Sequence, residues 1–121
     1  MANTFKTVTF AAEPASAGTP YVMYTVANST TTVVLGLVLA NIHTTAVTAS
    51  VQLDSNTANR NGANNVANGV SQLVKDVTIP SGSSLELLSG GKVVLETGDK
   101  IQIDCSVADK LSGTLSIMEI T

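Results

Sequence analysis

His43 and Cys105 are the two side chains whose chemistry could support nucleophilic catalysis. The sequence has one histidine and one cysteine, so a small Cys–His hydrolase would require these two residues to meet in the fold. His43 follows an apolar run, where a residue at a strand end making ordinary hydrogen bonds is the favoured interpretation. Cys105 lies on the apolar side of an alternating segment, as a small buried hydrophobe would. We therefore predict no catalytic residues and a protein that is not an enzyme.

Carboxylates occur at two further positions of interest. Glu96 and Asp99 flank Thr97-Gly98, and paired carboxylates could perform acid–base chemistry or bind a hard cation. Asp and Gly also belong in β-turns for backbone reasons alone, which is the interpretation we favour. Asp54-Ser55-Asn56 is similar to the start of a calcium loop, but Asn65 occupies the position that needs an acidic residue.

Metal, cofactor and nucleic-acid binding lack their sequence signals. Gly90-Gly91 falls between strand segments, without the helix that a phosphate-binding glycine loop requires, and no Cys/His set has zinc spacing. The net charge is −3 and the six basic residues are scattered, whereas a nucleic-acid binder needs clustered cations. The four aromatic residues all fall in the first fifth of the chain, which argues against base stacking later on. We predict no metal, no cofactor and no nucleic acid.

Composition bounds the size and the surroundings of the domain. The 121 residues suffice for one domain. Charged residues make up 12% of the chain, about half the usual share, so we expect a surface that other subunits cover. Val33 to Ile42 is the most apolar stretch, far short of the roughly 20 residues that span a bilayer. We predict a strand buried on both faces there, no membrane contact and, from residues 1–6, no signal peptide.

Period-two alternation predicts the fold class. The ranges 47–53, 101–107 and 111–117 alternate apolar with polar residues, which is typical of half-buried strands. Turn sequences at 80–84, 89–91 and 97–99 divide the second half of the chain into short strands. We expect strands near 20–27, 31–40, 46–53, 70–79, 84–88, 92–96, 100–107 and 111–120. The prediction is an all-β, single-domain sandwich or jelly roll of about eight strands.

Two segments stand outside this pattern. We expect residues 1–19 to form an extended N-terminal arm, with a weaker strand near 6–10, before a sandwich domain over 20–121. Residues 54–70 form a long polar loop that contains six Asn, and a loop of that length is either mobile or used for contact. The candidate interface residues are Phe5 and Phe10 in the arm and Arg60, Asn61 and Asn64 in the loop. Deleting residues 1–12 is expected to weaken partner binding and leave the sandwich folded.

Several stretches resemble a known group of proteins. These are Leu73 to Leu85, Gly90 to Ile101, Leu111 to Ile120, and the apolar strand Thr32 to Asn41 that ends in Ala-Asn. Together they resemble small virion proteins of tailed bacteriophages, particularly of cyanophages and related marine phages. The resemblance covers roughly residues 20–121, and the Asn-rich loop has no counterpart in it.

The resemblance implies a β-sandwich subunit of a phage particle. It favours a capsid decoration (cement) protein on the capsid exterior, made in the host cytoplasm, with the major capsid protein and copies of itself, as a homotrimer, as partners. A neck, tail or baseplate component is the alternative within that group. A carbohydrate- or receptor-binding module is an alternative of another class, because jelly rolls often serve that purpose.

Overall fold

The computed structural model describes residues 2–55, 70–87 and 92–121. These residues form strands and turns, with no helix among them. The strands are β1 (Asn3–Glu13), β2 (Tyr21–Thr25), β3 (Thr31–Asn41), β4 (Val47–Asp54), β5 (Val70–Ile79), β6 (Ser84–Leu87), β7 (Val93–Leu95), β8 (Lys100–Cys105) and β9 (Leu111–Ile120). All eight predicted strands match within two residues at each end, and the predicted all-β sandwich is confirmed.

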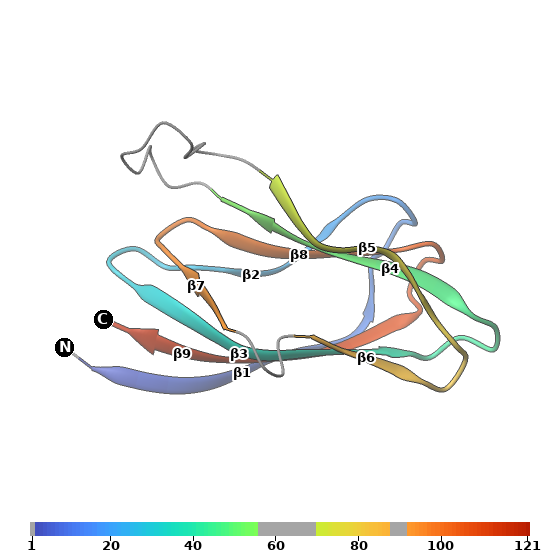
Figure 1. The fold of residues 1–121 in the computed structure, drawn as a ribbon, viewed down its shortest axis with the longest axis horizontal. Helices are drawn as coiled ribbons and strands as arrows, with labels where there is room; N and C mark the ends of the chain where they lie inside the picture. Colours follow the sequence, from blue (N-terminus) through green and yellow to red (C-terminus); the bar gives the residue numbers. More distant parts are fainter. Residues whose placement is uncertain (1, 56–69, 88–91) are drawn as a thin grey trace.

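The strands form two antiparallel sheets packed face to face (Figure 1). Sheet A has the order β1-β9-β3-β6, with β7 also paired to β3, and sheet B has the order β2-β8-β4-β5. β6 and β7 pair with successive parts of β3 and act as one interrupted strand. The chain therefore folds as nested pairs, β1 with β9, β2 with β8, β3 with β6/β7 and β4 with β5. That arrangement is a jelly roll.

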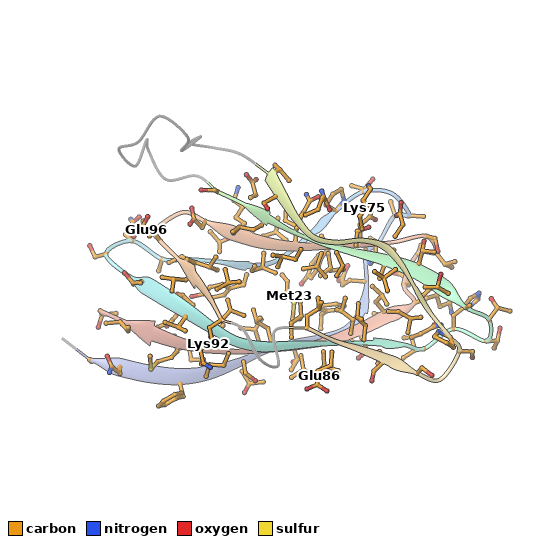
Figure 2. The ribbon with its side chains drawn as sticks, in the orientation of Figure 1. Met23, Lys75, Glu86, Lys92 and Glu96 are labelled. Carbon is orange, nitrogen blue, oxygen red and sulfur yellow. The ribbon has the colours of Figure 1, made fainter. Side chains whose placement is uncertain are left out.

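The core lies between the two sheets. The predicted inward residues of β4, β8 and β9 are buried or half-buried, so the alternation in the sequence reports the inner face correctly. Figure 2 shows the Met23 side chain between the sheets, whereas Lys75 and Glu86 lie on opposite outer sides. Side chains from both sheets interdigitate there, as in other sandwiches.

β3 differs from the prediction that it is buried on both faces. Its inward residues, such as Val34, Leu37 and Leu39, are fully buried. Its outward residues are only half-buried or exposed, and Val38 retains 38% of its surface. The reason is that no described residues form a layer over the outer side of sheet A. The apolar run in the sequence arises because both faces of β3 are apolar. The inner face is buried in the core, and the described residues leave the outer face uncovered.

The N-terminal region also differs from the predicted arm. Asn3–Glu13 is a strand of sheet A, paired with β9 along most of its length. Phe10 is buried to 8% exposure and packs edge-on against Tyr21 with ring centroids 5.4 Å apart. β-branched and aromatic residues favour a strand here, and Pro14 follows its end. Deleting residues 1–12 would remove a strand and a core residue, so we no longer expect the sandwich to survive it.

Candidate interaction surface

A row of apolar side chains crosses the outer face of sheet A. The register aligns Phe5 of β1 with Met118 of β9, Met118 with Val33 of β3, and Val33 with Val94 of β7. Because paired residues point to the same side of a sheet, these four side chains form one line, which we call the apolar row. Phe5 is 72% exposed and Val94 is 61% exposed, while Met118 and Val33 are half-buried. The row is apolar surface that the described residues of the protomer leave open to solvent.

A hollow of about 380 Å³ lies beside the apolar row on the same face. Its floor is Gly36, in β3, where the pairing with β9 shifts register between Val34 and Gly36. A Cβ atom at Gly36 would have no neighbour within 4 Å, so the missing side chain opens the hollow. We call it the Gly36 hollow; its lining includes Leu35, Val38, Glu86, Thr114 and Ser116.

Charge distinguishes the two outer faces. Among the described strands of sheet A, the register places one charged residue on the outer face, Glu86 of β6. The outer face of sheet B carries the register pair Asp54 and Lys100, and also Asp104. Neighbouring β5 adds Lys75, which lies on that side in Figure 2. Sheet B therefore suits solvent, and sheet A suits a partner.

A glutamine ladder reinforces the polar character of sheet B. Gln102, Gln52 and Gln72 lie side by side on β8, β4 and β5. The Gln52 amide donates to Gln102 at 2.7 Å, and the Gln72 amide donates to Gln52 at 3.0 Å. These side chains satisfy one another across the strands, which makes this face a stable hydrated surface.

A polar cluster joins the two sheets at the end where β1 begins and β9 ends. The Tyr24 hydroxyl donates to Glu119 Oε2 at 2.6 Å and lies 2.8 Å from the Thr32 hydroxyl, and Lys6 Nζ is 2.6 Å from Glu119 Oε1. Burial and the neighbouring carboxylate raise the pKa of Tyr24 to about 12. The hydrogen bonds from Lys6 and Tyr24 hold the pKa of Glu119 below its usual value. The cluster connects β2 to sheet A, and the polar side chains of the cluster form hydrogen bonds and an ion pair with one another.

The predicted interface residues have different positions. Phe5 is exposed on the outer face of sheet A, as an interface residue would be. Phe10 packs in the core, so it is not accessible to a partner, and its prediction as an interface residue was wrong. Arg60, Asn61 and Asn64 lie outside the described residues.

His43 and Cys105 have separate structural settings. Cys105 is buried in the core on β8, opposite Ala49. His43 lies in the turn after β3, where its backbone N–H donates to the Asn41 side chain and its carbonyl accepts from Ser81. A thiol enclosed by apolar side chains is poorly placed to attack a substrate.

The acidic pair at 96–99 serves the turn between β7 and β8. The Glu96 N–H donates to Asp99 Oδ2 at 3.0 Å, and the Asp99 N–H donates to the Glu96 carbonyl at 2.9 Å. Gly98, with φ of +87°, permits the tight bend. Within residues 2–55, 70–87 and 92–121, no group of three or more potential metal ligands occurs.

Three residues of the apolar row escaped prediction from the sequence: Val33, Val94 and Met118. A signal was present, because residues 33–40 contain no charged or strongly polar side chain to mark a wet face. Such a strand is buried on both sides or is covered by another molecule. Sequence alone does not separate these two cases.

Comparisons with known proteins add little. No family model matches the sequence, and no curated protein matches it. Among solved structures, the chain is similar to a protein of the disulfide-linked pili that form Bacillus endospore appendages. The identity is 14%, the TM-score is 0.47, and the alignment covers 99% of this chain and 87% of that chain. No inference about this chain follows from a likeness that distant. In the described residues, no helix is long and apolar enough to cross a membrane.

Proposed function

We propose that this chain is a non-enzymatic structural subunit of a phage particle that binds and stabilises the capsid exterior as a decoration (cement) protein. The observation that carries a structural role is the outer face of sheet A, which in the described residues is apolar, nearly free of charge and uncovered. Exposed apolar patches of this kind mark protein–protein contacts. The assignment to a phage particle rests on the sequence resemblance over roughly residues 20–121.

The proposed partners are the major capsid protein and further copies of this chain, with a homotrimer as the proposed assembly. The particle exterior is the proposed location, after synthesis in the host cytoplasm.

The test is to add purified protein to capsids that lack it and to count bound copies by quantitative mass spectrometry. A decoration protein saturates at many copies per particle, in proportion to the number of capsomers.

The second candidate is a neck, tail or baseplate component, which would use the same apolar face. Saturation at a few copies, located at a single vertex or on the tail by electron microscopy, would establish that candidate instead. Failure to bind any part of the particle would contradict both.

A carbohydrate-binding module is less well supported. Sugar sites usually stack a ring on an aromatic side chain, and the described residues that line the Gly36 hollow include none. A second hollow, of about 340 Å³ around Thr30 and Thr97, is also without aromatics among its described lining residues. Saturable binding on a glycan array would overturn this preference.

A further inference from the structure

Phe5 is the most exposed of the large apolar side chains in the described residues, with 72% of its surface open. Burying such a side chain is favourable relative to leaving it in water, because apolar surface is removed from solvent. Its backbone is held in place by pairing with Met118 of β9. The ring is therefore an apolar projection on a fixed strand.

The Gly36 hollow is the complementary feature on the same face. It offers about 380 Å³ with the apolar side chains Leu35 and Val38 in its lining. The absent Cβ of Gly36 leaves the floor open, because nothing lies within 4 Å of that position. The register shift between Val34 and Gly36 marks a β-bulge, which re-aims neighbouring side chains.

Phe5 does not fill the hollow of its own protomer. It lies on β1 and Gly36 lies on β3, with β9 between them. Two interstrand spacings separate the two strands by roughly 10 Å, and Phe5 is not among the residues that line the hollow. A phenyl ring that enters the hollow must come from another molecule.

Charge favours a second copy of the same chain as that molecule. The outer face of sheet B carries charges of both signs, including Asp54, Lys100 and Asp104, and a contact there would have to remove their hydration. The outer face of sheet A brings one carboxylate from each copy, Glu86, at the rim of the hollow. The face also holds both the projection and the cavity, so it is complementary to itself.

We propose that Phe5 of one copy inserts into the Gly36 hollow of a second copy, with the outer faces of the two A sheets in contact. A two-fold axis that lies in the interface, parallel to the two sheets, would form this contact twice and would place Met118 and Val33 near the centre. The interaction goes beyond the proposed function, because it names a specific contact that joins copies in pairs, separate from the proposed homotrimer, and needs no particle. A failure to bind capsids would leave it standing.

The first experiment is sedimentation velocity of the full chain over a range of concentrations. We expect reversible association of the wild-type protein, weakened at least about tenfold by Phe5→Ser and, separately, by Gly36→Val. Phe5→Ser changes an exposed side chain, and the Cβ of Gly36→Val enters open space, so both variants should fold. Circular dichroism and thermal melting verify this. Val22→Ser is the matched control, because Val22 is 39% exposed on sheet B, and it should associate like the wild type.

The decisive experiment mixes the two deficient variants. Phe5→Ser retains the hollow and lacks the ring, whereas Gly36→Val retains the ring and fills the hollow. A mixture should associate more strongly than either variant alone, since the ring of one fits the hollow of the other. A wild-type protein that stays monomeric at every concentration overturns the proposal. So do two variants that associate like the wild type, or deficient variants whose mixture shows no recovery.

Discussion

At the scale of single residues, Asn41 shows how one side chain organises a chain reversal. It is the last residue of β3 and is 3% exposed. Its amide donates to the carbonyls of Thr45 at 3.0 Å and Ile79 at 2.9 Å, and its oxygen accepts from the His43 N–H at 2.8 Å. The side chain thereby joins β3, the following turn and the end of β5. This explains why an apolar strand ends in a buried amide.

We predict that Asn41→Ala lowers the free energy of unfolding by roughly 2–3 kcal/mol. The substitution leaves the Ile79 carbonyl buried without that donor, and an unsatisfied buried group costs roughly 1–3 kcal/mol. Urea unfolding followed by circular dichroism measures the change. Asn28→Ala is the control, because Asn28 is exposed and should change stability by less than about 0.5 kcal/mol. Equal effects of the two substitutions would contradict the structural role of Asn41.

The Glu119 carboxylate gives a second prediction at this scale, a dependence of stability on pH. Its pKa is lowered in the folded chain from the usual value of 4.5 by Lys6 and Tyr24. Its contribution is therefore fully present above about pH 4.5 and is lost as the pH falls through the lowered pKa. We expect Glu119→Gln to be less stable than the wild type by roughly 1 kcal/mol at neutral pH. That difference should shrink in acid, as measured by urea unfolding from neutral to acidic pH; a constant difference would exclude the ionised carboxylate as its source.

At the scale of elements, β1 is fastened to β9 by an aromatic ring over a glycine. Phe10 and Gly113 are direct partners in the register, and a Cβ at Gly113 would overlap the Phe10 ring. The glycine therefore makes room for the ring to lie on the neighbouring strand and enter the core. Gly36 has the opposite setting, since a Cβ there would meet no atom within 4 Å.

These two strand glycines provide a matched pair of substitutions. We predict that Gly113→Ala destabilises the fold by about 1–3 kcal/mol, because the ring must move out of a packed site. Gly36→Ala should be neutral or slightly stabilising, since alanine is favoured over glycine within a strand by roughly 0.5–1 kcal/mol. Thermal and urea unfolding of both variants provide the measurement. Comparable losses in the two variants would rule out the Phe10 contact as the cause.

The strands differ in how well sequence predicts them, and the reason is physical. β4, β8 and β9 have one wet and one dry face, so their alternation marks both the strand and its buried side. β1 lacks that contrast, because residues 3–7 are exposed on both faces. Phe10 is buried because it pairs with Gly113, which is 103 positions away in the chain. The apolar row has the same difficulty. Its four residues come from four strands, and only the register, which no local pattern contains, brings them into line.

At the scale of the whole molecule, the jelly roll presents two unlike outer faces. Sheet B is covered by the glutamine ladder and by charged residues, whereas sheet A carries the apolar row and the Gly36 hollow. The low charge of the sequence is therefore not spread evenly over the surface. Charged residues are scarcest on the outer face of sheet A. Association through that face should therefore depend on the burial of apolar surface more than on ion pairs.

This asymmetry predicts that self-association is insensitive to salt. Raising the salt from about 0.05 M to about 0.5 M shortens the screening length from roughly 14 Å to roughly 4 Å, which would weaken a contact built from ion pairs. With Glu86 as the one charge that the register places on this face among the described strands of sheet A, we expect the dissociation constant to change by less than about twofold. Sedimentation equilibrium at the two salt concentrations measures it, with Glu86→Gln as the control for the remaining carboxylate. A steep loss of association with salt would instead place the contact on sheet B, where Asp54, Lys100 and Asp104 lie.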